Sequence, residues 1–265
     1  MSQVRPAAVA GMFYPGSAVE LRPMVEDFVA TATPREPGYS PKAIIAPHAG
    51  FVYSGPVAAS AFRCLAVDSD IIRRIVLIGP AHRMPVRGLA LPGQDAFETP
   101  LGVVPVDQEL VELISDLPQV SINRAAHAPE HCLEVELPFL QVVLEEFSIL
   151  PLLVSAVSAD EVAAVLDRVW GGAETRIVVS SDLSHYLSYD AARQVDRATA
   201  QQVLELDESV AENCACGAQA INGLLEAARR RQLVSRLLDL RNSGDTAGDR
   251  MRVVGYGSFG FAVAS

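Results

Sequence analysis

Short apolar runs alternate with stretches of helical periodicity along most of this chain. Strands are predicted where apolar residues are continuous and bounded by turn residues, at Ala43–Ala46, Ile75–Ile78, Leu89–Leu91, Ser148–Val154, Ile177–Ser180 and Val253–Val263. Helices are predicted between them, at Ala18–Thr31, Pro56–Leu65, Gln108–Leu117, Leu133–Glu146, Ala159–Trp170, Ala191–Leu206 and Ala218–Leu233. This alternation is typical of an α/β fold with a largely parallel central sheet flanked by helices.

The polar positions mark where these elements begin and where the chain turns. Ser158 precedes Asp160 and Glu161, as expected for the capped start of a helix. Residues 242–249 form a polar segment rich in turn residues, which we expect to be the most mobile part of the chain. No repeat or linker rich in proline and serine interrupts the pattern. We therefore predict a single domain over residues 1–265.

Composition and charge exclude several classes of protein. The 21 basic and 32 acidic residues give a net charge of −11, which opposes binding to a phosphate backbone. No apolar run is long enough for a membrane helix or a signal peptide. Four cysteines without a secretory signal are typical of reduced thiols. We expect a cytoplasmic protein that binds neither nucleic acid nor membrane, and no pattern indicates its oligomeric state.

Candidate chemistry lies at the ends of three predicted strands. Each of these strands is followed within a few residues by a histidine, namely His48, His82 or His185, although the chain has only five histidines. The carboxyl ends of parallel strands share one edge of a sheet, where ligands bind. Imidazole is the commonest metal ligand and titrates near neutral pH. The pattern therefore predicts a metal or acid–base site at this edge.

Two acidic residues accompany histidines at a spacing of three. Asp182 precedes His185 by three residues and is expected to orient its imidazole, or else to cap the structure that follows. Glu134 follows His131 by three residues, and on a helix the two share a face. That pair is either a ligand or acid–base unit or an ordinary acidic first turn. His127 has no assigned role.

The cysteines fall into two groups. Cys214 and Cys216 precede an amphipathic helix, where a thiol is expected to have a lowered pKa and to act as a thiolate ligand or nucleophile. Their spacing does not match a zinc knuckle, so burial as small apolar residues is the alternative. Cys64 and Cys132 lie within helical patterns and are predicted to be core residues.

The ordered set of short motifs resembles the Memo family, the group of AmmeMemoRadiSam system protein B. The resemblance runs nearly from end to end. It rests on Ala10-Gly11-Met12-Phe13-Tyr14-Pro15, Ala46-Pro47-His48-Ala49-Gly50 with Tyr53 and Gly55, Gly79-Pro80-Ala81-His82, Glu130-His131 through Leu137-Pro138, Ser180-Ser181-Asp182-Leu183-Ser184-His185-Tyr186, and Cys216-Gly217. Family members are similar in fold to the class III extradiol dioxygenases, which hold iron(II) with two histidines and a carboxylate.

The resemblance implies a metal site formed by His48, His82 and Cys216, with His185 nearby. Cysteine here replaces the carboxylate of the dioxygenases, so dioxygenase activity does not follow from the fold. A site of two histidines and a thiolate favours iron(II) or copper, with zinc as the alternative. Some family members are described as phosphotyrosine-peptide adaptors or as metal-dependent redox proteins.

Three functional hypotheses follow. The first is a metal-binding protein with oxidoreductase-like, dioxygenase-related chemistry, in which His185, Asp182 and His131 manage protons. Tyr53 and Glu134 are then expected to contact the substrate. The second is a metal-dependent hydrolase in which Glu134 or His185 acts as base. The third is a module that captures a small molecule or peptide in the same pocket without turnover.

Overall fold

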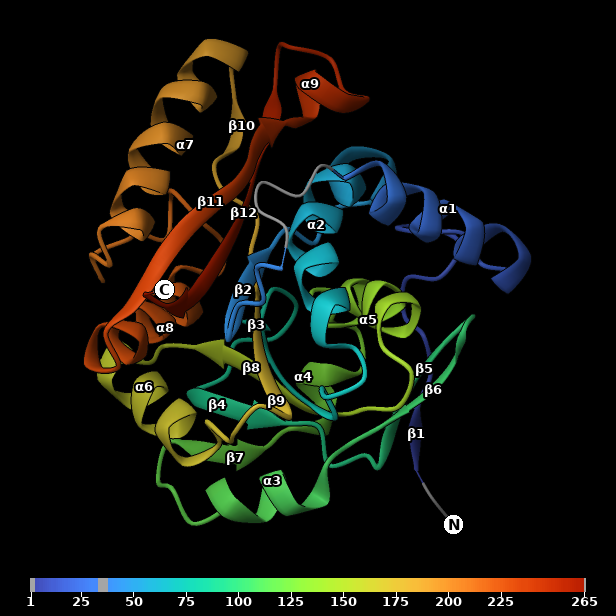
Figure 1. Cartoon of the computed structure of the whole chain (residues 1–265), viewed down its shortest axis with the longest axis vertical. Helices are drawn as coiled ribbons and strands as arrows, with labels where there is room; N and C mark the ends of the chain where they lie inside the picture. Colours follow the sequence, from blue (N-terminus) through green and yellow to red (C-terminus); the bar gives the residue numbers. More distant parts are fainter. Residues whose placement is uncertain (1–2, 33–37, 265) are drawn as a thin grey trace.

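The computed structural model describes residues 3–32 and 38–264 and shows a mixed central sheet covered by helices (Figure 1). The strands are β1 (Val4–Arg5), β2 (Ala43–Ala46), β3 (Arg74–Pro80), β4 (Gly88–Leu91), β5 (Ala96–Thr99), β6 (Gly102–Pro105), β7 (Val120–Ile122), β8 (Ser148–Ser155), β9 (Thr175–Ser180), β10 (His185–Leu187), β11 (Leu233–Asn242) and β12 (Val253–Val263). The helices are α1 (Ala18–Thr31), α2 (Phe51–Leu65), α3 (Gln108–Ile114), α4 (Arg124–His127), α5 (Leu137–Val143), α6 (Ala159–Arg168), α7 (Tyr189–Leu204), α8 (Ala218–Arg230) and α9 (Ser243–Thr246), with 3₁₀ turns η1 (Ala66–Asp68) and η2 (Glu134–Glu136).

The large sheet has a parallel centre and antiparallel flanks. Its strand order is β10-β12-β2-β9-β3-β8-β4-β7, and β11 pairs with β12. The four central strands β2, β9, β3 and β8 are parallel, whereas β12 and β4 join this centre in antiparallel fashion. The predicted α/β fold with helices around a central sheet is thus confirmed. Its parallel part is the part that carries the strand-then-histidine pattern.

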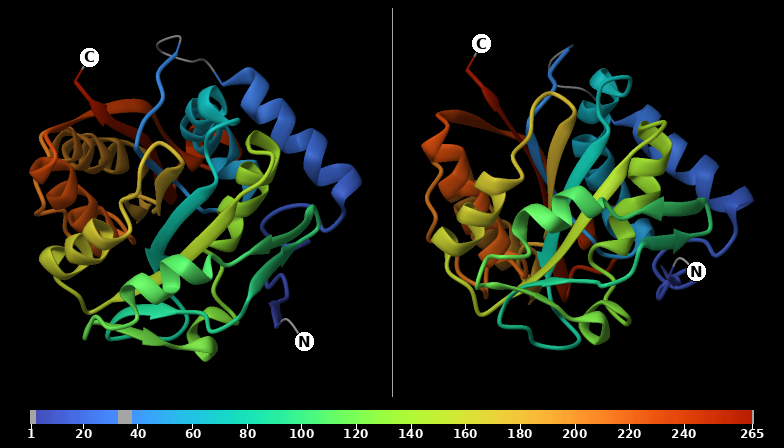
Figure 2. Two further views of the ribbon diagram at one scale, coloured as in Figure 1. Left: turned by 60° about the horizontal axis from the view of Figure 1, so that its bottom comes forward. Right: turned by 90° about the horizontal axis from the view of Figure 1, so that it is seen from below.

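The central strands are continuous apolar runs because both of their faces are buried. Along β2, Ile44 packs into one core and Ile45 into the other, and β3 alternates in the same way. Helices α1, α2 and α5 cover the first face, and α6, α7 and α8 cover the second (Figures 1 and 2). This two-sided burial holds the strand ends, and hence the residues that follow them, in fixed positions.

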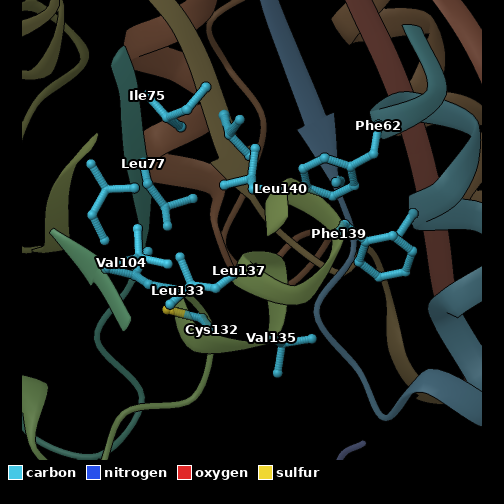
Figure 3. Close-up of a cluster of buried hydrophobic side chains, with 14 of the residues drawn as sticks. Phe62, Ile75, Leu77, Val104, Cys132, Leu133, Val135, Leu137, Phe139 and Leu140 are labelled. Carbon is cyan, nitrogen blue, oxygen red and sulfur yellow. The ribbon is translucent and has the colours of Figure 1, made fainter. Parts of the chain in front are cut away.

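The core under α2 and α5 reaches the segment that contains Cys132 (Figure 3). Phe62 of α2 stacks on Phe139 of α5 with 5.1 Å between ring centroids. Cys132 lies in the same cluster and is fully buried, which confirms its prediction as a core residue. The core therefore anchors the chain directly before η2.

Several elements differ from the sequence prediction. The last long helix ends at Arg230, and β11 follows it and pairs along its length with β12. The predicted helix over 133–146 is a 3₁₀ turn followed by the shorter α5. Strands β1, β5 and β6 form a separate three-stranded sheet. The segment expected to be mobile contains the single turn α9, capped by Asn242.

Within the part of the chain that the structure describes, no helix combines the length and apolar character needed to cross a bilayer.

Candidate metal site

The site lies at the carboxyl ends of three neighbouring strands. Strand β9 runs between β2 and β3, and its last residue, Ser180, is in register with Ala46 at the end of β2. His48 follows β2 and His82 follows β3, so their side chains meet across the end of β9. Their ring centroids are 5.1 Å apart. The small side chain of Ser180 leaves room for this approach.

The third imidazole at the site belongs to His131. Its ring centroid lies 5.4 Å from that of His48 and 4.8 Å from that of His82. One ring nitrogen from each of the three histidines lies within 4.8 Å of the others, an arrangement that could hold a metal ion. The exposed fraction rises from 1% for His48 to 12% and 28% for the side chains of His131 and His82. The site is therefore closed at His48 and open to solvent at His82.

A glycine in β3 allows the His131 segment to lie this close to the sheet. A Cβ atom on Gly79 would stand 3.0 Å from Cys132 Sγ and 3.0 Å from Leu133 Cδ2. A side chain at this position would crowd Cys132 and Leu133, the two residues that follow His131. The Gly79-Pro80-Ala81-His82 motif thus positions two of the three imidazoles.

Glu130 orients two of the imidazoles through one carboxylate oxygen. Its Oε1 lies 3.0 Å from His82 Nδ1 and 3.1 Å from His131 Nδ1. Its Oε2 accepts a hydrogen bond of 2.6 Å from the backbone N–H of His82. Although burial opposes it, these hydrogen bonds hold the pKa of Glu130 well below its usual value. The hydrogen bond at His82 Nδ1 leaves Nε2 of that ring as the nitrogen that can bind a ligand. Nδ1 of His131 lies 3.1 Å from the same oxygen but has no hydrogen-bond partner among the described residues.

His48 has a different partner. Its Nδ1 lies 2.7 Å from Ser180 Oγ, and its Nε2 lies 3.3 Å from Cys216 Sγ. Burial lowers the pKa of His48 well below 6.5, and the neighbouring imidazoles His82 and His131 lower it further. The ring is therefore neutral at physiological pH, the form in which imidazole binds metals.

Cys216 lies at the buried side of the site. A Cβ atom on the next residue, Gly217, would meet Ser181 Cβ at 2.7 Å, so glycine is needed for this close approach. The thiol sulfur accepts a hydrogen bond of 3.3 Å from Asp182 N–H. Burial and the charge of Asp182 nevertheless raise the pKa of Cys216 to about 12. The expected lowering of the thiol pKa before a helix is therefore wrong for Cys216.

Asp182 was predicted to orient His185, but in the structure it holds the turn that contains His48. Its Oδ1 accepts a hydrogen bond of 2.9 Å from His48 N–H, and burial raises its pKa to about 7. His185 instead has its Nδ1 held 2.8 Å from the carbonyl oxygen of Leu183. The imidazole of His185, at the start of β10, is outside the group formed by His48, His82 and His131.

The two residues expected to contact substrate lie in contrasting places. Glu134 is fully buried and accepts hydrogen bonds from Arg5, the backbone of Ala8 and Val9, and the Tyr14 hydroxyl. Its oxygens are thus engaged by the N-terminal segment rather than facing a ligand. Tyr53, in the first turn of α2, is 40% exposed, and its contact with substrate stays a prediction.

A second group of possible ligands, formed by His82, Glu130 and Cys132, is less suited to a metal. The Cys132 thiol donates to the carbonyl of Pro80 at 3.1 Å, and burial raises its pKa well above 9.0. Both oxygens of Glu130 already accept hydrogen bonds from backbone N–H groups. The three imidazoles are the better of the two donor sets. Cys216 belongs to neither set, although its Sγ lies 3.3 Å from His48 Nε2.

Some residues that build the site were not predicted from the sequence. Glu130, Ser180 and Phe13 had no assigned role, yet Glu130 and Ser180 hold the imidazoles and Phe13 packs on His131 with ring centroids 4.7 Å apart. The sequence offered one indication of their role, because each of them lies in one of the short motifs that carry the family resemblance. Ser180 lies 132 positions from His48, and Glu130 lies 48 positions from His82 although it also contacts the adjacent His131, so spacing alone could not identify these contacts.

Comparisons with known proteins show the family and the fold. The family model of Memo-like proteins matches residues 5–260. A MEMO1 family protein of Aquifex aeolicus is 38% identical over 96% of this chain and 97% of its own length. Another, from Nitrosopumilus maritimus, is 32% identical over 97% and 99%. Among solved structures, the uncharacterised protein JW3007 of Escherichia coli K12 is similar in fold, with a TM-score of 0.53 and 16% identity over 82% of this chain and 98% of that chain.

Proposed function

Because this chain belongs to the family of Memo-like proteins, we propose that it is a metal-binding protein with oxidoreductase-like chemistry. The observation that carries the proposal is the convergence of His48, His82 and His131 within 4.8 Å, with Cys216 Sγ 3.3 Å from His48. Buried or half-buried imidazoles gathered in this way oppose one another's protonation, and their neutral nitrogens are then free to bind a cation.

His48, His82 and Cys216 are the proposed ligands, with His131 as the further donor. The thiolate makes this set softer than two histidines and a carboxylate, which favours iron(II) or copper over magnesium or calcium, with zinc as the alternative. The cysteines at positions 64, 132, 214 and 216 are free thiols, which supports a cytoplasmic location. When bound, a metal of this type supplies electron transfer and polarisation of a coordinated ligand.

The residues around the ligands have separate tasks in this proposal. Glu130 holds the rings of His82 and His131 in position. His185 and Asp182 carry protons at the edge of the site. A small molecule or peptide approaches on the exposed side of His82. A hydrolase that uses Glu134 as base is disfavoured, because that carboxylate is buried and fully occupied.

Metal content measured by mass spectrometry tests the ligand set. The protein is purified without oxygen and without a histidine tag, dialysed against one metal, and compared with His48→Ala, His82→Ala and Cys216→Ser. We expect the two histidine variants to lose nearly all bound metal and Cys216→Ser to lose its preference for copper over zinc. His185→Ala is the matched control and should keep its metal. Unchanged metal content in His48→Ala would refute the assignment.

Redox behaviour tests the proposed chemistry separately. A spectroscopic titration of the metal-loaded protein with a mild reductant and then with oxygen should show a reversible change in iron or copper. Only zinc bound in the protein, with no response to either reagent, would favour the hydrolase or the binding module.

A further inference from the structure

The hydroxyl of Ser180 is surrounded by three buried polar groups. Its Oγ lies 2.7 Å from His48 Nδ1, 2.6 Å from Glu136 Oε1 and 2.8 Å from the carbonyl oxygen of Cys132. Ser180 and Glu136 have no exposed surface, and His48 has almost none. Solvent cannot complete these hydrogen bonds, so the three partners must share the available protons among themselves.

Counting protons leaves one arrangement that satisfies every contact. A hydroxyl donates one hydrogen bond and accepts two. The Cys132 carbonyl can only accept, so the Ser180 proton points to it. The other two neighbours must then donate to Oγ, His48 through Nδ1–H and Glu136 through a protonated Oε1. If Glu136 were ionised and took the hydroxyl proton, two oxygens without a proton between them would face each other at 2.8 Å.

The surroundings of Glu136 also favour the neutral acid. No cation is paired with it among residues 3–32 and 38–264, and its Oε2 is buried without a hydrogen-bond partner there. The acidic groups that act on it or lie near it are Asp182 and the Cys132 thiol. The charge of Asp182 opposes ionisation of Glu136, and the neutral thiol offers no compensating positive charge. Burial, followed by Asp182, raises the pKa of Glu136 well above 4.5, against the opposing effect of the Ser180 hydroxyl. An ionised carboxylate at this place would be costly.

We propose that Glu136 is a positioning residue held as a neutral carboxylic acid, which through Ser180 keeps His48 in the Nδ1–H tautomer with Nε2 directed at Cys216. His82 reaches the same tautomer through the ionised Glu130. An anionic partner makes the other ring nitrogen of an imidazole a stronger electron-pair donor to a metal. A neutral partner orients the ring without this effect. The two histidines are thus electronically different. The effect of this difference on metal binding rests on the proposed function. The protonation states of Glu136 and His48 do not.

Infrared spectroscopy of the metal-free protein at pH 7 tests the neutral acid. The wild type should show the carbonyl stretch of protonated carboxylic acids, and Glu136→Gln should lose part of it. The remainder belongs to Asp182, whose pKa is raised to about 7 and which is therefore also partly protonated at this pH. Glu145→Gln, at an exposed glutamate, is the matched control and should retain the band. A band of equal intensity in the wild type and in Glu136→Gln would overturn the proposal.

Nitrogen NMR of His48 and zinc binding test the positioning role. Glu136→Gln keeps an N–H donor for Ser180, so it should preserve the Nδ1–H tautomer and bind zinc within a few-fold of the wild type. Glu136→Leu removes the donor and should mix the tautomers and weaken zinc binding by about 10–100-fold. Equal weakening in both variants would contradict the proposal. If Glu136→Leu does not fold, the glutamine variant and the infrared band decide the matter. Correct protonation without zinc binding would refute the metal function alone.

Discussion

Glu134 and Glu136 lie two residues apart on the turn η2, are both fully buried, and have opposite surroundings. Glu134 forms an ion pair of 2.7 Å with Arg5 and accepts three further hydrogen bonds. Glu136 contacts the Ser180 hydroxyl, and the charged group that acts on it is another acid, Asp182. The comparison teaches that burial alone does not determine the charge of an acid. The partner that the fold brings to it does.

The two glutamates also serve different parts of the molecule. Arg5, which pairs with Glu134, donates to the carbonyl oxygen of His127 at 2.8 Å and to that of Glu130. The contacts of Glu134 and Arg5 therefore hold the N-terminal segment against the residues that precede His131. Glu136 instead contacts Ser180, which in turn contacts His48. One short turn thus connects the stability of the protein with the geometry of its site.

The largest expected effect comes from breaking the ion pair. Arg5→Met leaves Glu134 buried without its cation, which should lower the free energy of unfolding by about 3–5 kcal/mol. Urea denaturation at pH 7 measures the loss. Arg22→Ala, in an exposed pair with Glu26 at 3.9 Å, is the control and should cost less than about 1 kcal/mol. Similar losses in both variants would show that the buried pair contributes little.

A parallel change at the two glutamates sharpens the comparison. Glu134→Gln should destabilise the protein by about 3 kcal/mol at pH 7, because Arg5 then lacks its counter-charge. Glu136→Gln replaces a neutral acid by a neutral amide of the same size and should be at least as stable as the wild type. Both are measured by the same urea denaturation. Equal destabilisation would mean that Glu136 is ionised.

The smallest expected effect is a dependence on pH. It concerns the difference in unfolding free energy between the wild type and Glu136→Gln, and it is small for each unit of pH. The pKa of Glu136 is raised by burial above the 4.5 of an unfolded glutamate, so the folded wild type binds the extra proton. Its stability relative to Glu136→Gln should therefore fall as pH rises above 4.5, by at most about 1.4 kcal/mol per unit. Denaturation midpoints of both proteins from pH 4 to 7 measure this. A constant difference would contradict the neutral acid.

The sequence was most informative where local pattern and burial agree. Strands β2 and β12 begin and end where the apolar runs predicted. Strand β11 was missed because the predicted helix was extended to Leu233 and charged residues interrupt the leucines that follow. Only pairing with β12 makes that segment extended. The approach of His48 to His82 follows from their positions after parallel strands. The inclusion of His131 does not, because its segment comes from another part of the chain.

The sequence by itself determined the buried strands, the α/β class and the placement of His48 and His82 at one edge, since these depend on apolar periodicity and short motifs. Only the tertiary structure decided which side chains orient those histidines and which buried acids carry charge. Arg5 is 129 positions from Glu134, and Ser180 is 44 positions from Glu136. The charge and role of a buried acid depend on such distant partners, because the groups within hydrogen-bonding distance replace the water that it loses on folding.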